Sequence, residues 1–106
     1  MKNTKKANLN KAFRELRKLG YVAEQDLGST QSSGWSYAED IAKKKGYGDD
    51  YKAVFYHGQD ADDLKESQTC YLSWSGDGHE IVKVLEANEI TVEWDGSDKT
   101  RIKITI

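Results

Sequence analysis

An imidazole, an amide and a carboxylate come close together in the segment His57-Gly58-Gln59-Asp60, at the end of a predicted strand. Sheets with helices on their faces often place functional sites at strand ends. A histidine that is oriented by a carboxylate can act as a general base, and Asp60 is near enough in sequence to orient His57. The alternative is a histidine whose hydrogen bonds only stabilise the loop. His57 and Asp60 are therefore the candidate site of a small enzyme.

The sequence offers this pair no convincing nucleophile. The single cysteine, Cys70, lies inside a predicted strand, where a free cysteine usually packs as a small hydrophobic side chain. One cysteine also excludes a disulfide within the chain and a zinc site made of cysteines alone. A metal site from His57, Asp60 and His79 has no ligand spacing to support it. We therefore expect neither a metal nor a cofactor, and we favour a protein that is not an enzyme.

A glycine-rich turn, Ser75-Gly76-Asp77-Gly78, joins a predicted strand to a predicted helix, where backbone amides can hold an anion. No lysine follows it as in a phosphate-binding loop, and Ile81 stands where a dinucleotide-binding motif has its third glycine. Asp77 would also repel a phosphate. We predict instead that Asp77 is the N-cap of the following helix.

The stretch from residue 47 to residue 66 combines aromatic and acidic residues, which together suit an interface with a basic partner. Tyr47 and Tyr51 are flanked by glycine and aspartate, so we predict that both are exposed and act as interface anchors. The predicted binding residues are Tyr47, Asp49, Asp50, Tyr51, Asp62, Asp63 and Glu66. The alternative is that the tyrosines belong to the core and that the carboxylates only keep the protein in solution.

Positive charge is concentrated in the first 20 residues, although the whole chain has a net charge of −2. A basic helix can bind the phosphate backbone of nucleic acid, but the acidic remainder of the chain would repel that backbone. The residues of this nucleic-acid alternative are Lys5, Lys6, Lys11, Arg14, Arg17 and Lys18. The competing interpretation is a solvated helix face that binds no ligand.

Hydrophobic periodicity predicts the elements that position these residues. Asn8 is the expected N-cap of a helix over residues 8–19, which leaves residues 1–7 as a flexible basic tail. Further helices are predicted over residues 33–45 or 36–45 and 79–88, with one or two helical turns after residue 60. The predicted strands are residues 21–25, 51–57 and 69–74, followed by a C-terminal β-hairpin of residues 90–94 and 101–106. This order predicts a single α+β (or open α/β) domain over residues 8–106, with one mixed sheet of about five strands and three main helices mostly on one side.

The C-terminal hairpin has a register that its own apolar pattern restricts. The alternating apolar residues are Ile90, Val92 and Trp94 on one strand, and Ile102, Ile104 and Ile106 on the other. Both sets share a face only if the loop has an odd number of residues. We expect a loop of three or five residues, in which Gly96 is free to take a positive φ. Glu93 then faces Lys99 or Arg101 across the ladder.

Composition limits where the chain can work. Hydrophobic residues make up 37% and charged residues 32%, and the chain has no proline, so no proline-rich linker divides it. No window approaches the roughly 18 apolar residues of a membrane span, and the first residues lack the apolar stretch of a signal peptide. We therefore expect a cytoplasmic protein without a membrane partner. Nothing in the sequence favours one oligomeric state.

Four short strings occur in order along the chain: Gln31-Ser32-Ser33-Gly34-Trp35, Val54-Phe55-Tyr56-His57-Gly58-Gln59-Asp60, Tyr71-Leu72-Ser73-Trp74-Ser75-Gly76 and Val92-Glu93-Trp94-Asp95-Gly96. Together they resemble a family of small uncharacterised bacterial and phage-type domains. Its members show a C-C-Q-x-C-G segment, then F-Y-H-x-Q-D, a Y-L-x-x-G strand and a closing E-W-D-G hairpin. The resemblance spans residues 25–106 and implies a shared fold unit with no known activity.

The first of these motifs departs from the family pattern. Ser29, Thr30 and Ser33 stand where the resemblance places cysteines, so a thiol redox or metal-binding role of that segment does not carry over to this chain. The phage-type membership implies a small inhibitor of host defence, similar in role to anti-CRISPR proteins.

The function that we expect is a non-enzymatic protein-binding module, encoded on a phage or mobile element, that contacts its partner through residues 47–66. One alternative is a nucleic-acid-associated protein that uses the basic N-terminal helix. The other is a small enzyme with a site at His57 and Asp60.

Overall fold

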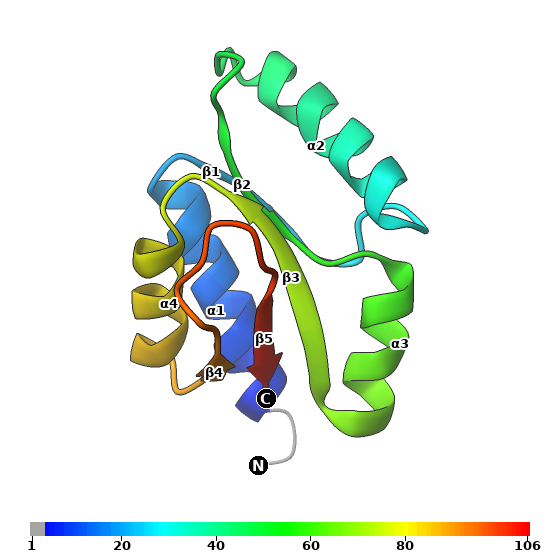
Figure 1. The fold of residues 1–106 in the computed structure, drawn as a ribbon, viewed down its shortest axis with the longest axis vertical. Helices are drawn as coiled ribbons and strands as arrows, with labels where there is room; N and C mark the ends of the chain where they lie inside the picture. Colours follow the sequence, from blue (N-terminus) through cyan, green and yellow to red (C-terminus); the bar gives the residue numbers. More distant parts are fainter. Residues whose placement is uncertain (1–3) are drawn as a thin grey trace.

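A mixed five-stranded sheet with four helices makes up the fold, in a computed structural model that describes residues 4–106 (Figure 1). The helices are α1 (Thr4–Lys18), α2 (Gln31–Lys44), α3 (Gly58–Ser67) and α4 (Gly78–Ala87). The strands are β1 (Tyr21–Glu24), β2 (Lys52–Phe55), β3 (Thr69–Ser75), β4 (Thr91–Glu93) and β5 (Ile102–Thr105). The predicted α+β class is confirmed, and α3 is a full fourth helix.

The strands lie in the order β1-β2-β3-β5-β4. β1 and β2 are parallel and are joined through α2, whereas every other neighbouring pair is antiparallel. Phe55 of β2 is opposite Ser73 of β3, and Leu72 of β3 is opposite Ile102 of β5. Because successive side chains of a strand point to opposite faces, this register sends alternate residues into two separate hydrophobic clusters.

The larger cluster lies on the face that α1 and α4 cover (Figure 1). Apolar residues at helical spacing put Leu9, Phe13 and Leu16 of α1 on this cluster, where each is fully buried. Tyr56, which directly follows β2, meets Phe13 edge to face, with ring centroids 6.1 Å apart. Leu64 brings one side of α3 into the same cluster.

The smaller cluster lies on the opposite face, where α2 covers β1 and β2 (Figure 1). Ala38 and Ala42 of α2 pack there with Val22, Ala53 and Phe55 of the two strands. The helices therefore flank both faces: α1, α4 and one side of α3 pack on the larger cluster, as expected for most of the helices, and α2 covers the opposite face. Farther along this face of β3, Tyr71 is 45% exposed.

Helix starts were predicted less well than helix centres. α1 begins at Thr4 and not at Asn8, so residues 4–7 are helical and do not form a flexible tail; the other tail residues, 1–3, lie outside the described range. Lysine and alanine are good helix formers, which explains the longer helix. α2 begins at Gln31, because Thr30 and Ser33 form a capping box two residues before the predicted start. α3 begins at Gly58, before Asp60 and not after it.

The N-cap of α4 was predicted correctly. Oδ1 of Asp77 accepts hydrogen bonds from the backbone N–H groups of His79 at 3.0 Å and Glu80 at 3.2 Å. Gly78 must be glycine for a packing reason, since a Cβ there would lie 2.6 Å from the Trp94 ring and 2.8 Å from the Trp74 ring. Capping and packing thus explain the glycine-rich turn.

The hairpin has the predicted shared apolar face but a longer loop. Residues 94–101 separate β4 from β5, and Glu93 is opposite Lys103, with Oε1 and Nζ 3.9 Å apart, and not opposite Lys99 or Arg101. The longer loop is held by Asp95, whose Oδ1 accepts from Ser97 N and Thr100 Oγ1, both at 2.9 Å. Across residues 4–106, no helix combines the length and the apolar character that crossing a bilayer requires.

Candidate functional site

Three neighbouring hollows follow α2 along the face of the sheet that it covers. The first, of about 170 Å³, is lined by Glu39, Ala42, Lys43, Tyr47, Gly48, Asp49 and Tyr51. The second, of about 340 Å³, is lined by Trp35, Asp49, Asp50, Tyr51, Ser75 and Gly76. The third, of about 110 Å³, is lined by Gln31, Trp35, Ser73, Trp74, Asp98, Lys99, Thr100 and Arg101. Because adjacent hollows share Tyr51 or Trp35, we name them together the α2 groove.

The aromatic wall of the α2 groove is fixed by packing. Trp35 meets Phe55 edge to face, with centroids 4.9 Å apart and ring planes at 85°. Tyr47 and Tyr51 pack against the smaller hydrophobic cluster. Ser75 Oγ donates to the backbone carbonyl of Tyr51 at 3.0 Å, which ties the loop before β2 to β3. The groove is therefore a preformed feature of the fold.

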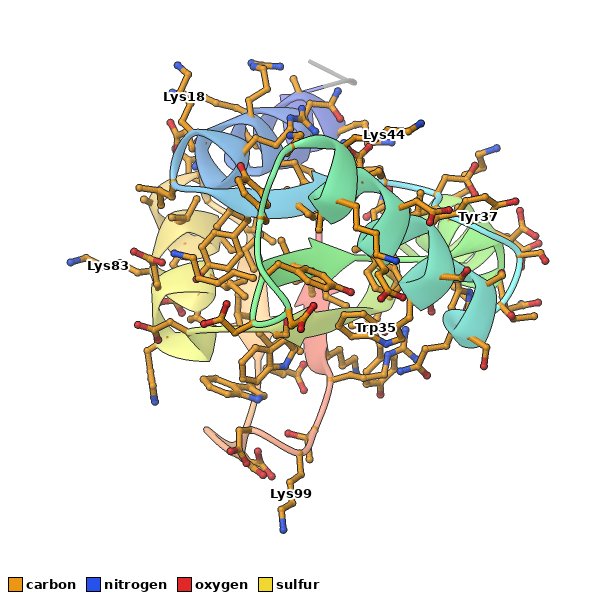
Figure 2. The ribbon with its side chains drawn as sticks, turned by 90° about the horizontal axis from the view of Figure 1, so that it is seen from above. Lys18, Trp35, Tyr37, Lys44, Lys83 and Lys99 are labelled. Carbon is orange, nitrogen blue, oxygen red and sulfur yellow. The ribbon has the colours of Figure 1, made fainter. Side chains whose placement is uncertain are left out.

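The prediction that Tyr47 and Tyr51 are exposed is wrong. Both are half-buried, because the loop that carries them folds back against α2. The exposed tyrosines are Tyr37, 53% exposed on the outer side of α2 (Figure 2), and Tyr71. Burial, and then the Glu39 carboxylate, raises the pKa of Tyr51, so its hydroxyl is neutral near pH 7. Tyr47 and Tyr51 therefore line the groove as half-buried side chains.

Carboxylates line the two larger hollows of the α2 groove, and Lys43 at the first of them is paired with Glu39. Asp49 and Asp50 are exposed, and among the described side chains no lysine, arginine or histidine nitrogen lies within 4.0 Å of either carboxylate. Lys52 follows closely in sequence but points to the other side of the sheet, 4.5 Å from the Tyr21 ring centre and 3.8 Å from Oε1 of Glu80. Asp49 and Asp50 are thus available to a cation from outside.

The other predicted binding residues lie elsewhere. Asp62, Asp63 and Glu66 belong to α3, beside the lower part of β3 in Figure 1, whereas the loop before β2 lies at the opposite end. Of the three, Asp63 is half-buried. The stretch from 47 to 66 is therefore not one surface, because β2 runs between its two acidic groups.

His57 and Asp60 do come together, and a residue from the C-terminal hairpin joins them. Nε2 of His57 is 3.3 Å from Oδ2 of Asp60, and Nη2 of Arg101 is 2.5 Å from the same oxygen. Arg101 also donates to the backbone carbonyl of Tyr71 at 2.6 Å and lies over the Tyr71 ring. Asp60 is only 4% exposed. A buried carboxylate thus holds an imidazole and a guanidinium together on the sheet.

This arrangement favours a structural role for His57. Its Nδ1 is buried and has no hydrogen-bond partner among the described residues. Cys70 faces the other side of the sheet, and burial, followed by the Asp60 carboxylate, raises the pKa of its thiol to about 12. A thiol with that pKa is not a nucleophile near neutral pH. The trio joins the start of α3 to the start of β5.

Sequence reasoning missed Arg101 and Ser73. The hairpin pattern predicted Arg101 as a possible partner of Glu93, because that pattern involves only nearby residues. The actual partner of Arg101 is Asp60, 41 positions away in the sequence. Ser73 is 1% exposed, and its Oγ has no hydrogen-bond partner among residues 4–106. The available signal was alternation: Ser73 is a polar residue on the opposite face to Cys70 and Leu72 within one strand.

The basic residues of α1 form a partial surface. Lys11, Arg14 and Lys18 are exposed, and Figure 2 shows Lys18 pointing outward. Arg17 is engaged, since its Nη1 donates to the carbonyl of Ala23 at 2.6 Å. Lys6 borders a separate cavity, and the side chain of Lys5 lies outside the described residues. The part of the chain that the structure describes holds no group of three or more histidine, cysteine, aspartate or glutamate residues placed to bind a metal.

No curated protein and no solved structure matches the chain. A family model described as "Domain of unknown function (DUF6891)" matches residues 1–106. The chain belongs to this family. The match confirms that the chain belongs to an uncharacterised domain family, and it covers α1 as well as the segment that contains the four sequence strings.

In this DUF6891 member, the segment that carries serine and threonine caps α2. Ser33 Oγ accepts from the N–H groups of Ser29 at 3.1 Å and Thr30 at 3.0 Å, and Thr30 Oγ1 accepts from Ser33 N at 3.1 Å. Gly34 follows at a close approach, since a Cβ there would lie 2.4 Å from Cε1 of Phe55. The segment thus fixes the start of α2, and with it Gln31 and Trp35 of the groove.

Proposed function

We propose that the chain is a non-enzymatic protein-binding module whose α2 groove receives an arginine or lysine side chain of a partner protein. The observation that carries this proposal is the second hollow, in which Trp35 and Tyr51 form an aromatic wall beside Asp49 and Asp50. An aromatic face and a carboxylate together attract an organic cation: a cation–π contact contributes about 0.5–2 kcal/mol.

The third hollow supports a segment of chain as the bound species. Ser73 Oγ and Arg101 Nε are buried without partners among the described residues, and both residues line this hollow. A backbone carbonyl of a bound segment would accept from either group, which offsets the cost of leaving a buried donor unsatisfied. The end of the groove with Asp49 and Asp50 would then bind the basic side chain of the partner. The end with Ser73 would bind the partner's backbone next to that side chain.

Two observations favour this function over the alternatives. The imidazole of His57 is 12% exposed and is bound to Asp60, which gives a catalytic reaction little access to it. On the basic face of α1, Arg17 already donates a hydrogen bond to a backbone carbonyl, which leaves fewer free cations to bind nucleic acid. The α2 groove, in contrast, combines a hollow with two exposed carboxylates, Asp49 and Asp50, at the same place.

A short peptide with one central arginine tests the groove without knowledge of the partner. The readout is the indole N–H resonance of Trp35 in a two-dimensional NMR titration, and the control peptide carries citrulline, the neutral isostere of arginine. We expect the arginine peptide to shift this resonance at concentrations where the citrulline peptide does not. An unchanged Trp35 resonance with both peptides contradicts the proposal.

A matched pair of variants separates the groove from general charge. Asp49→Asn with Asp50→Asn removes two carboxylates at the groove, and Asp62→Asn with Glu66→Gln removes two from α3. We expect the first double variant to weaken the arginine peptide about tenfold, equal to about 1.4 kcal/mol, and the second to have little effect. Equal weakening by both would mean nonspecific attraction and would reject the site.

The class of partner rests on the resemblance to phage-type domains, which supports a cytoplasmic host-defence protein. Bacteria that carry an active CRISPR or restriction system and express the chain should form more plaques on phage challenge than bacteria without it. The Asp49→Asn, Asp50→Asn variant should lose this effect. Unchanged plaque counts with the wild-type chain in each system would reject the inhibitory role and leave the peptide test standing.

A further inference from the structure

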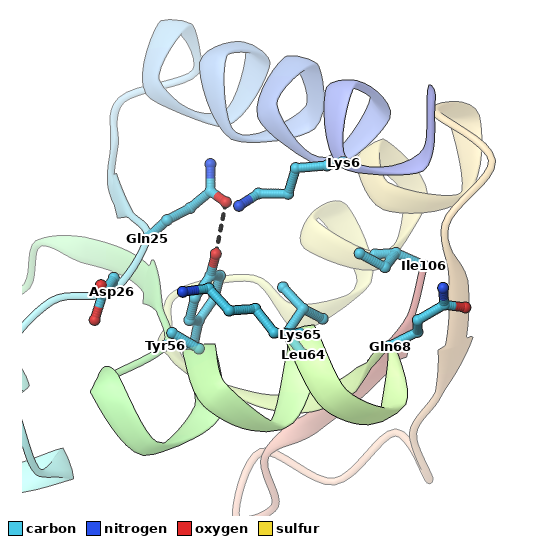
Figure 3. Close-up of a pocket in the computed structure, with 9 residues that line it drawn as sticks. Lys6, Gln25, Asp26, Tyr56, Leu64, Lys65, Gln68 and Ile106 are labelled. Carbon is cyan, nitrogen blue, oxygen red and sulfur yellow. Dashed lines mark hydrogen bonds between the residues drawn. The ribbon is translucent and has the colours of Figure 1, made fainter. Parts of the chain in front are cut away.

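A second cavity, larger than any single hollow of the α2 groove, lies on the other face of the sheet, between α1 and α3 (Figure 3). Its volume is about 530 Å³, within the usual range of small-molecule pockets. The lining residues are Lys6, Gln25, Asp26, Tyr56, Ala61, Leu64, Lys65, Gln68 and Ile106. We name it the α1–α3 cavity. It shares no lining residue with the α2 groove.

The inner wall of the α1–α3 cavity is apolar, and its polar groups are already ordered. Leu64, Ala61 and Ile106 supply aliphatic surface. Tyr56 Oη donates to Oε1 of Gln25 at 2.7 Å, and Nε2 of Gln25 donates to Oδ1 of Asn10 at 2.8 Å (Figure 3). This chain of bonds occupies the Tyr56 proton and one of the two N–H groups of Gln25, and it fixes the orientation of the Gln25 amide.

Two amines supply the cationic donors of the cavity. Lys6 comes from α1 and Lys65 from α3; in Figure 3 the Lys6 side chain ends beside Gln25, and the Lys65 side chain crosses Tyr56 toward the side of Asp26. Among the described residues, no carboxylate lies within 4.0 Å of either amine. Asp26 lines the cavity as well, and it stands apart from the two amines in Figure 3. The cavity therefore joins an apolar wall to a doubly cationic opening.

We propose that the α1–α3 cavity binds a small amphipathic carboxylate, with the carboxylate between Lys6 and Lys65 and the apolar chain along Leu64, Ala61 and Ile106. Charge-assisted bonds from two amines fix the head group. Burial of the chain adds about 0.8 kcal/mol for each methylene group removed from water. Both parts of the ligand are needed, since a buried chain without the anion leaves two ammonium groups facing it.

Octanoate is the probe for this site. Isothermal titration calorimetry measures its affinity, and the side-chain amide resonances of Gln25 and Gln68 report its position by NMR. We expect octanoate to bind and to shift both amides, whereas acetate, octanol and octylamine bind at least tenfold more weakly. Equal binding of acetate would mean an anion site without a tail pocket and would overturn the proposal, as would equal binding of octanol.

Lysine variants provide the second test, because both side chains are exposed and tolerate change. Lys6→Gln and Lys65→Gln should each weaken octanoate about fivefold or more, while Lys11→Gln, on the outer side of α1, should leave its affinity unchanged. Ala61→Leu should fill the cavity and abolish binding, with the melting temperature as a check on folding. The proposal would be overturned if octanoate affinity were unchanged in both Lys6→Gln and Lys65→Gln. It would also be overturned if Lys11→Gln lowered the affinity as much as these two variants do. The arginine-peptide titration is independent of this result.

Discussion

Arg101 and Asp60 form an ion pair across the sheet, with Nη2 of the guanidinium 2.5 Å from Oδ2 of the carboxylate. The pair fastens the beginning of β5 to the first turn of α3, and the carboxylate is almost completely buried. We expect Asp60→Ala to lower the free energy of unfolding by about 3 kcal/mol, because it strands a partly buried guanidinium without its counter-charge. Urea denaturation measures this loss. Asp62→Ala, an exposed carboxylate on the same helix, is the control and should change stability by less than about 0.5 kcal/mol. Similar losses in the two variants would show that the pair does not anchor α3.

Gly34 lies where α2 approaches β2 most closely. We expect Gly34→Ala to destabilise the protein by about 1–3 kcal/mol, because the new Cβ would sit 2.4 Å from Cε1 of Phe55 and force that ring to move. Thermal unfolding followed by circular dichroism measures the effect. Ser32→Ala, an exposed position in the same turn of α2, is the matched control. A Gly34→Ala protein as stable as Ser32→Ala would mean that the helix can shift away from the sheet at no cost.

The thiol of Cys70 should make the protein less stable in alkali. Burial, and then the Asp60 carboxylate, raises its pKa from 9.0 to about 12, so the folded chain keeps a proton that the unfolded chain releases. The stability that this thiol contributes is complete below pH 9 and is lost as the pH rises toward 12. We expect Cys70→Ala to flatten the decline in the free energy of unfolding by up to about 1.4 kcal/mol per pH unit. Urea denaturation from pH 7 to pH 11 measures both slopes, and parallel slopes would contradict the assignment.

Asp95 should titrate at unusually low pH. The backbone N–H of Ser97 and then the hydroxyl of Thr100 hold the pKa of this carboxyl below 3.8 by bonding to its charged form. Carbon-detected NMR of the side-chain carboxyl should give a midpoint below 3.8, and Thr100→Val should raise it. Thr91→Val, at an exposed position outside the loop, should leave the midpoint in place. A midpoint insensitive to Thr100→Val would mean that the Asp95–Thr100 bond does not form in solution.

Local pattern predicted the elements whose formation depends on their own residues. The spacing of Leu9, Phe13 and Leu16 predicts α1, and the alternation of Ile102 and Ile104 predicts β5 on the core face. Both patterns indicate which side of a helix or strand is buried, and in the folded protein that side packs in the hydrophobic cluster on the sheet. The early start of α1 was missed because Thr4 to Ala7 carry no apolar periodicity, although their helix propensity is adequate.

The candidate sites depended on contacts between distant segments, which the sequence does not show. The Asp60–Arg101 pair requires α3 and β5 to meet beside β3, and no local pattern encodes that meeting. Tyr51 was predicted to be exposed because its neighbours are glycine and aspartate, whereas the turn returns it to α2. The α1–α3 cavity combines residues from position 6 to position 106. From the sequence alone, Lys6 and Lys65 cannot be distinguished from other solvent-exposed lysines, because their proximity depends on how α1 and α3 pack.

The sheet separates a large hydrophobic cluster from a small one, and this unequal division should appear in hydrogen exchange. The fully buried side chains of α2 are the small ones of Ala38 and Ala42, and Trp35 and Ile41 are only partly buried, whereas α1 inserts the fully buried Leu9, Phe13 and Leu16. Amide protons of α2 should therefore exchange through local opening while those of α1 await global unfolding. The α2 groove is thus formed by the layer that detaches most readily. A ligand seated in it would slow exchange in α2 before anywhere else, by selecting the closed state of that layer.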